Sequence, residues 1–303
     1  MRRVRERFPE AIGSVDELPA PIGDGILQSQ PAGSIREIIR IPPGSYPVRR
    51  TIWGFELPFG WRQTPERILV FGEHAVTVME IEQAAITATM SVPLGALIDI
   101  HLFQELLYSW IELVWAGQDG VNAIKAEYNS VGGSLIWQGL TYIRESFPQQ
   151  SVHEPDSLPD IDLSGFPFKF QSFLRSSLMP GERLVVAIYQ PAIPPRSRRW
   201  RRLISPNRVV AVTDRNIIVI EDQRNRFLRR DRAAADYSIV RHFYPLGRLR
   251  QVAVELGPDA DLLRLRFGAD AAIHDATLPF EPLRAQQLHD ALRACSLASS
   301  AST

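Results

Sequence analysis

The sequence predicts a mainly β protein of the α+β class, built from two tandem copies of one small module. Three observations support this prediction. Blocks of apolar residues recur in the same order in both halves of the 303-residue chain. One segment in each half, 124–128 and 263–267, alternates apolar with polar residues, as half-buried strands do. One amphipathic helical segment closes each half, and a chain of this length suits two domains better than one.

Three pairs of segments carry the internal repeat. IPPGS (41–45) matches LMPGE (178–182) at an offset of 137 residues, and TPERILVFGEHAVTVMEI (64–81) matches SPNRVVAVTDRNIIVIED (205–222) at 141. VPLGALIDI (92–100) matches YPLGRLRQV (244–252) at 152, and this offset continues to the closing helix. Apolar positions meet apolar positions in one order, which indicates a duplicated module.

Each copy is expected to be a run of short strands followed by one helix. Leu263, Leu265 and Phe267 alternate with arginines, which predicts a half-buried strand. The segment TDRN (213–216) lies between two apolar runs and predicts a hairpin turn. Segments 133–147 and 281–296 carry apolar residues at spacings of three and four, so both predict amphipathic helices.

These elements set the expected domain boundaries. We expect a poorly ordered N-terminal segment because its residues are rich in proline, glycine and acids. An acidic, proline-bearing linker separates the two repeats. The expected parts are the N-terminal segment 1–33, repeat 1 at 34–147, the linker 148–166, repeat 2 at 167–296 and a disordered tail at 297–303.

Composition narrows the classes of partner and location. The net charge is zero, so no global charge favours one kind of partner. The single cysteine, Cys295, excludes an internal disulfide, and its helical spacing from Leu288 and Leu292 predicts a core position. The chain shows no secretory signal and no run of 18 apolar residues. We therefore expect a cytoplasmic protein, with peripheral membrane attachment as the alternative.

No recognisable catalytic motif is present. The sequence contains no P-loop, no G-x-G-x-x-G, no G-x-S-x-G and no H-E-x-x-H. Its six histidines are scattered without a ligand spacing. We therefore expect neither an enzyme nor a cofactor, and no metal site.

Four segments of the second half resemble the bacterial pleckstrin-homology-like (PH-like) family. They are LMPGERLVV (178–186), RVVAVTDRNIIVIED (208–222), YPLGRLRQV (244–252) and EPLRAQQLHDALRAC (281–295). The first half is similar but departs in detail. The resemblance implies two strongly bent antiparallel sheets or partly open barrels, each capped by a C-terminal helix. Such folds serve as scaffolds that bind lipids, peptides or proteins, and the fold alone does not decide which.

Two arginine-rich loops in repeat 2 are the candidate anion site. The offsets grow from 137 to 141 and then to 152, so repeat 2 is expected to have longer loops after its first and third strands. In a meander both loops lie at one end of the sheet, and guanidinium groups suit phosphate. Solvated loops, or pairing with the acidic linker or repeat 1, remain the alternative. The candidate residues are Arg198, Arg199, Arg201, Arg202, Arg226, Arg229 and Arg230.

The charge distribution agrees with this candidate. Residues 34–147 hold 8 basic and 12 acidic residues, whereas residues 167–303 hold 22 and 13. The net charges are therefore −4 and +9, and the second half is the cationic one.

Repeat 1 carries apolar residues at the equivalent end. Exposed apolar residues of this kind mark an interface, unless they pack into the core or against repeat 2. The candidate interface residues are Trp53, Phe55, Phe59, Trp61, Leu106 and Leu107.

Two functions follow from these candidates. The first is a non-enzymatic binding or scaffolding protein that acts through protein–protein contacts or self-association. The alternative is a peripheral membrane or polyanion binder that uses the arginine-rich loops of repeat 2. Nucleic acid is a weaker variant of the alternative, because no groove-reading helix or RNA-recognition signature is present.

Overall fold

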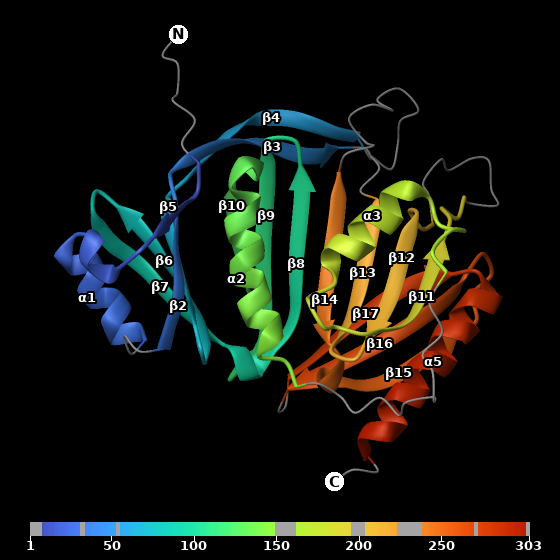
Figure 1. Cartoon of the computed structure of the whole chain (residues 1–303). Coiled ribbons are helices and arrows are strands. Elements are labelled where there is room, and N and C mark those ends of the chain that lie inside the picture. Colours follow the sequence, from blue (N-terminus) through green and yellow to red (C-terminus); the bar gives the residue numbers. More distant parts are fainter. Residues whose placement is uncertain are drawn as a thin grey trace. The chain divides into compact units, whose positions relative to one another are not determined.

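The computed structural model describes residues 8–30, 34–52, 55–148, 162–194, 204–222, 238–269 and 272–300. Within these ranges, side chains are described except at 47–59, 269 and 296–300. The described chain is mainly β, with several antiparallel sheets and four α-helices, which confirms the predicted α+β class (Figure 1). No helix in the described part of the chain has both the length and the apolar composition needed to cross a membrane.

The chain divides into two compact units. Unit 1 comprises residues 1–97, 103–113 and 123–147, and unit 2 comprises residues 98–102, 114–122 and 148–303. The middle of one strand, Ile98–Leu102, therefore belongs to unit 2 although the chain on either side of it belongs to unit 1.

The first half of the chain begins with short elements and continues as a long antiparallel series. Its elements are β1 (Glu10–Ile12), η1 (Val15–Glu17), α1 (Ala20–Ser29), β2 (Ile35–Ile41), β3 (Gly44–Ile52), β4 (Phe55–Thr64), β5 (Glu66–Gly72), β6 (Ala75–Glu82), β7 (Ala85–Pro93), η3 (Leu94–Ala96), β8 (Leu97–Glu105), β9 (Tyr108–Gly117), β10 (Gly120–Tyr128), η4 (Ser130–Gly132) and α2 (Gly133–Glu145).

From its first helix onward the second half has the same order of elements, without equivalents of the β3–β4 hairpin and of η4 among its described residues. Its elements are α3 (Phe168–Ser177), β11 (Leu184–Gln190), β12 (Arg208–Thr213), β13 (Asn216–Asp222), β14 (Ile239–Pro245), η5 (Leu246–Arg248), β15 (Leu249–Glu255), β16 (Asp261–Ala269), β17 (Ala272–Phe280) and α5 (Pro282–Ser300). The predicted turn at 213–216 and both predicted closing helices are confirmed.

The strands form four described sheets. Their orders are β1-β2-β5-β6-β7, β10-β9-β8-β14-β13-β12-β11, β15-β16-β17 and β3-β4. Consecutive strands pair as antiparallel meanders, for example β11 to β14 and β15 to β17. Antiparallel meanders need only short turns, which fits the short segments between the apolar blocks.

An arginine–glutamate pair occupies the same place in both halves. Arg67 of β5 lies opposite Glu80 of β6, and Arg208 of β12 lies opposite Glu221 of β13. Both pairs are ion pairs, with N···O distances of 2.7 Å and 2.5 Å. The sequence offset of 141 therefore joins positions that are equivalent in three dimensions.

The first strand shows a different offset from the one expected. Ile41 of β2 lies opposite Arg67, and Gln190 of β11 lies opposite Arg208. These first strands are thus related by 149 residues, and the predicted match of 41–45 with 178–182 at 137 is wrong. The shared Pro-Gly pairs belong to different turns, since Pro-Gly marks turns in general.

This correction changes the expected loop lengths. The connection after the first strand is eight residues longer in the first half, because the offset falls from 149 to 141. The β3–β4 hairpin occupies that extra length. The connection after the third strand is longer in the second half, as predicted: Gln83 and Ala84 suffice between β6 and β7, whereas 16 residues separate β13 from β14.

The N-terminal segment is ordered over residues 8–30, so the expectation of poor order is wrong there. Helix α1 starts behind Pro19 with a further proline in its first turn, where the missing N–H costs nothing. Its Ile22 and Ile26 are buried against Ile38, Ile68 and other residues of the β2–β5–β6 region. The apolar spacing of four, rather than the proline and glycine content, decides the structure.

A polar side chain closes the turn between the second and third strand in each half: Gln30, which is buried, and Glu182, which is half-buried. In the second half, Glu182 accepts hydrogen bonds from Thr213 Oγ1 (2.6 Å), Asn216 Nδ2 (2.8 Å) and the Met179 backbone N–H (2.9 Å). These contacts join LMPGE to TDRN, so both motifs have a structural role. Buried polar groups that are satisfied in this way fix a local conformation.

The first half closes the same turn with a neutral donor. Gln30 Nε2 donates to the Val70 and Ala75 carbonyl oxygens (3.1 and 3.2 Å) and to Thr77 Oγ1 (2.9 Å). Gly72 leaves the space for this amide, since a Cβ there would lie 1.6 Å from Gln30 Oε1.

Each closing helix packs on its own unit. In α2, Gly139 lets the helix approach β5 closely, because a Cβ there would lie 2.4 Å from the Phe71 ring. In α5, Leu288, Leu292 and Cys295 are buried in the core of unit 2, which confirms the predicted core position of the cysteine. Helix α5 continues to Ser300, into the segment that was expected to be a disordered tail. Most of the expected linker 148–166 lies outside the described residues.

Candidate functional site

The arginines of the predicted anion site lie outside the described residues. The strand ends that bracket the two arginine-rich segments are described. Gln190 pairs with Arg208, and Asp222 pairs with Ile239. Because β12 and β13 pair Arg208 with Glu221, all four strand ends lie at one end of the sheet. The predicted common origin of the two segments is therefore confirmed.

Asn207 ties these strand ends together. Its Oδ1 accepts hydrogen bonds from Tyr189 Oη (3.2 Å) and the Ala192 backbone N–H (2.9 Å), and its Nδ2 donates to Asp222 Oδ2 (2.9 Å). The buried Asp222 carboxylate also accepts from Lys169 Nζ of α3 (2.6 Å). The base of both arginine-rich segments is thus fixed by buried or half-buried polar contacts.

Three candidate interface residues of repeat 1 are strongly exposed. Trp61 of β4 and Leu106 are each 71% exposed, and Leu107 is 58% exposed. The possibility that these side chains fold into the core of unit 1 is therefore wrong for all three. Trp53 and the side chains of Phe55 and Phe59 lie outside the description. We call Trp61, Leu106 and Leu107 the apolar rim.

A cluster of polar and aromatic side chains joins the two segments that carry the apolar rim. Glu127 of β10 is buried and accepts hydrogen bonds from Tyr108 Oη (2.8 Å) and from Arg62. The Tyr108 ring lies 5.0 Å from the ring of Tyr46, which is paired with Arg62 across the β3–β4 hairpin. The hairpin base with Trp61 is therefore held beside the β8–β9 turn with Leu106 and Leu107.

Both tyrosines of this cluster stay protonated far above neutral pH. Burial, and then the Glu127 carboxylate, raises the pKa of Tyr46 to about 12. Burial, and then the hydrogen bond to Glu127, raises the pKa of Tyr108 further. Tyr108 therefore remains a hydrogen-bond donor to Glu127, and the cluster keeps its geometry over the physiological pH range.

Leu107 has an unusual backbone. Its φ is +60°, in the left-handed region that is unfavourable for a bulky side chain. Gln83 and Ala84 in the β6–β7 turn share a positive φ, so this backbone recurs in a second two-residue hairpin turn of unit 1.

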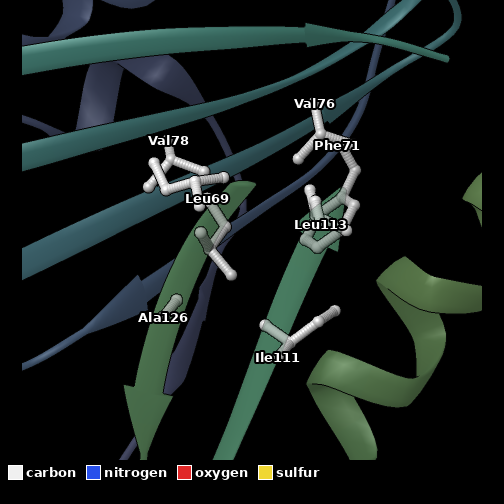
Figure 2. A pocket seen from close by; sticks show the side chains of 8 residues that line it. Leu69, Phe71, Val76, Val78, Ile111, Leu113 and Ala126 are labelled. Carbon is white, nitrogen blue, oxygen red and sulfur yellow. The ribbon is translucent and has the colours of Figure 1, made fainter. Parts of the chain in front are cut away.

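Unit 1 also contains a small apolar cavity between its sheet and the strands β9 and β10 (Figure 2). Its volume is about 10 Å³, and every lining side chain is apolar. This volume is at the lower limit for one water molecule, and such a molecule would lack polar partners. The cavity is a gap in packing and does not accommodate a substrate. Its lining residues are Leu69, Phe71, Val76, Val78, Ile111, Leu113, Ile124 and Ala126.

Unit 2 holds a histidine–carboxylate cluster that was not expected from the sequence. Asp99 of β8 is fully buried, and its Oδ2 lies 2.5 Å from His101 Nε2 and 3.4 Å from His242 Nδ1 of β14. His274 Nε2 of β17 lies 3.9 Å from the same oxygen. The four residues come from three strands of unit 2, and the histidine side chains are between 19% and 27% exposed.

The strand geometry explains how this cluster forms. Asp99 and His101 are two residues apart on β8, so their side chains lie on one face. Strand β14, which carries His242, is the neighbour of β8 in its sheet. The Tyr244 ring stacks on those of His242 (5.7 Å) and Phe267 (4.5 Å), and Phe267 is paired with His274. A D-x-H spacing on one strand was the only sequence signal, and it is a weak one.

The electrostatics keep Asp99 ionised. Burial by itself would raise the pKa of Asp99, but the charges and hydrogen bonds of His101 and His242 outweigh it and hold the pKa at about 2. Burial, and then the charge of Asp99, raises the pKa of Tyr244 well above its usual value. Burial lowers the pKa of His274, the charge of Asp99 opposes this effect, and the neighbouring histidines add to it. The cluster thus combines a buried carboxylate, a neutral phenol and imidazole nitrogens.

Sequence comparison assigns no relative: no protein-family model matches the chain, and no curated protein matches it.

Proposed function

We propose that the chain is a non-enzymatic binding or scaffolding protein of two PH-like modules that acts through protein–protein contacts of the first. The order of elements supports the family proposal. A four-strand meander (β11 to β14), a three-strand meander (β15 to β17) and a closing helix follow one another in the second half. The first half repeats this order with the β3–β4 hairpin added.

The apolar rim carries the proposal about function. Trp61, Leu106 and Leu107 are exposed, and the Tyr46–Arg62–Tyr108–Glu127 cluster holds their two segments together. Aromatic and aliphatic side chains of this kind form the centres of protein interfaces, where they lose water on binding. The favoured partner is a second copy of the chain, because the zero net charge gives no strong repulsion between copies.

Light scattering on the full chain over a wide concentration range tests self-association. We expect a mass that rises with concentration in the wild type and falls toward that of the monomer in Leu107→Asn and Trp61→Gln. Asparagine tolerates the left-handed backbone, so Leu107→Asn removes the apolar side chain without straining the turn. Ala84→Asn is the matched control, because Ala84 is also exposed in a two-residue hairpin turn and has a φ of +63°.

A photo-reactive side chain introduced at position 107, with position 84 as control, separates the possible partners. Crosslinking between copies at 107 alone supports self-association. A strict monomer that is never crosslinked to any protein at position 107 would remove the proposed function.

The alternative, binding of polyanions or anionic membranes, is favoured by one specific observation. The strand ends that bracket the two arginine-rich segments lie at one end of the sheet, where Asn207 and Asp222 connect them. Arginines attached there would approach a phosphate surface together, each contributing about 1 kcal/mol near an anionic membrane.

Vesicle sedimentation tests this alternative. Neutral and anionic phosphatidylserine-containing vesicles are compared at low and high salt, with a variant in which Arg199, Arg201, Arg229 and Arg230 are changed to glutamine. The control changes to glutamine four arginines that are exposed in the described part of the chain: Arg36, Arg250, Arg264 and Arg266. Binding to anionic vesicles that only the first variant loses supports the alternative. No binding of the wild type at low salt excludes it.

A further inference from the structure

We propose that Asp99, His101 and His242 bind a divalent transition-metal ion, for which Zn²⁺ is the best match, with His274 as a fourth ligand within reach. Asp99, His101 and His242 each offer one ligand atom, and these three atoms lie within 4.8 Å of one another. This site is separate from the apolar rim and from the arginine-rich segments, and it does not depend on the proposed function.

The types of ligand match the ion. Imidazole nitrogens and one carboxylate are the ligands that bind Zn²⁺ when cysteine is absent. Imidazole also favours a transition metal over Ca²⁺ or Mg²⁺, which prefer oxygen ligands. The single cysteine, Cys295, is not a ligand of this site, because it lies in the hydrophobic core of unit 2.

The distances fit a bound ion after small shifts. Bonds of about 2.0–2.1 Å in a tetrahedral arrangement separate the ligand atoms by roughly 3.3–3.4 Å. Asp99 Oδ2 and His242 Nδ1 are 3.4 Å apart. The 2.5 Å contact of His101 with Asp99 has to widen, and the 3.9 Å separation of His274 has to narrow slightly.

The buried carboxylate supplies a second, independent observation. Asp99 Oδ1 is fully buried and has no hydrogen-bond partner in the described structure, while both close histidines converge on Oδ2. An unsatisfied buried polar group is unfavourable by about 1–3 kcal/mol, and more when it is charged. A network that served only to stabilise the carboxylate would distribute its donors over both oxygens. A cation bound beside the carboxylate stabilises both Asp99 oxygens.

The surroundings have the features that orient metal ligands. The Tyr244 ring stacks on the His242 imidazole, and the ion would replace the 3.3 Å contact of Tyr244 Oη with His242 Nδ1. The rings of His101 and His242 meet edge to face at 4.2 Å. These ring contacts restrict the orientation of both imidazoles. The partial exposure of the three histidines gives the ion a path from solvent.

Metal titration of the full chain tests the proposal. The protein is treated with a chelator, and Zn²⁺ is added in competition with a chromophoric chelator. We expect binding with a stoichiometry of one and a loss of affinity of at least ~10–100-fold in His101→Gln and in His242→Gln. His289→Gln is the matched control, because His289 also contacts a carboxylate, Asp290 at 3.1 Å, but lies on α5 away from the cluster.

A spectroscopic variant covers the case in which a substitution disturbs folding. His101→Cys keeps a ligand that Zn²⁺ and Co²⁺ accept, so the variant retains binding. With Co²⁺ it gains a thiolate-to-metal absorption band in the near ultraviolet that the wild type and His289→Cys lack. Absence of stoichiometric Zn²⁺ binding by the wild type, or wild-type affinity in both glutamine variants, overturns the proposal. A His101→Cys variant that binds Co²⁺ without the band also overturns it.

Discussion

The turn between the second and third strand is closed by opposite chemistry in the two halves. In the first half the Gln30 amide donates to two carbonyl oxygens, whereas in the second half the Glu182 carboxylate accepts from a hydroxyl, an amide and a backbone N–H. Both side chains come from the chain that leads into the first strand of their half. The difference shows that the polar groups of this turn are satisfied in both halves, while the partner that donates differs.

The arginine–glutamate pairs differ in depth rather than in chemistry. The Arg208 side chain is 4% exposed and Arg67 is 13% exposed, with Glu221 and Glu80 at 23% and 34%. Arg208 also donates to the Pro279 carbonyl oxygen (3.1 Å) and lies over the Phe280 ring. The Arg208–Glu221 pair therefore connects β12 to the C-terminal end of β17. The Arg67–Glu80 pair is more exposed.

The largest expected effect tests whether burial sets the strength of the two arginine–glutamate pairs. Arg208→Met is expected to lower the free energy of unfolding by about 3–5 kcal/mol, because it leaves a partly buried carboxylate and a carbonyl unpaired. Arg67→Met is expected to cost about 1 kcal/mol. Hydrogen exchange of β12–β13 against β5–β6 measures the two effects locally. Equal costs at both positions would mean that burial does not set the strength of the pair.

Exchanging the two turn-closing side chains tests whether Gln30 is needed as a donor and Glu182 as an acceptor. Gln30→Glu places a carboxylate against the Val70 and Ala75 carbonyl oxygens and is expected to cost about 3 kcal/mol. Glu182→Gln keeps an acceptor for Thr213 and Asn216 and loses the bond from Met179, at about 1 kcal/mol. Denaturant unfolding of both variants checks the order. A larger loss in Glu182→Gln would contradict the assigned donor and acceptor roles.

Gly72→Ala tests the space beside Gln30. Its Cβ would displace the Gln30 amide, so we expect a loss of about 2 kcal/mol. Gly95→Ala is the control, since a Cβ there has no atom within 4 Å. In a double-mutant cycle with Gln30→Gly, the two changes should be non-additive by about 1 kcal/mol. Additive losses would show that Gly72 is not retained for the amide.

The smallest expected effect concerns the left-handed turn residues of unit 1. Leu107→Asn and Ala84→Asn should each raise the free energy of unfolding by about 0.5 kcal/mol, because asparagine adopts a positive φ more readily. Thermal unfolding measures the change. A clear destabilisation by Leu107→Asn alone would mean that the leucine packs on its own unit and is not available to a partner.

Much of the fold followed from local patterns. The alternation of Leu263, Leu265 and Phe267 and the helical spacing of 281–296 depend on neighbours along the chain, so they were predicted correctly. Helix α1 was missed because Pro19, Pro21, Gly23 and Gly25 outweighed the spacing of its two isoleucines. The first-strand offset was wrong because Pro-Gly turns occur in both halves at places that are not equivalent.

The sequence predicted the location of a candidate site only where that location follows from the order of strands along the chain. The common origin of the arginine-rich segments followed from the meander, and the exposure of Leu106 and Leu107 from their place in a turn. The Asp99 cluster was not predictable. Its residues come from β8, β14 and β17, which are distant in sequence, and their approach depends on which strands are neighbours in a sheet.

The connection after the first strand differs between the two halves by eight residues and carries different chemistry in each. A loop can double in length for only about 0.6 kcal/mol of closure entropy, and Asn207 holds the strand ends of unit 2 whatever lies between them. Evolution can therefore replace this segment without refolding the sheet. In one half it has become a hairpin with an exposed tryptophan and in the other a run of arginines. The same position is suited to grafting a foreign recognition peptide.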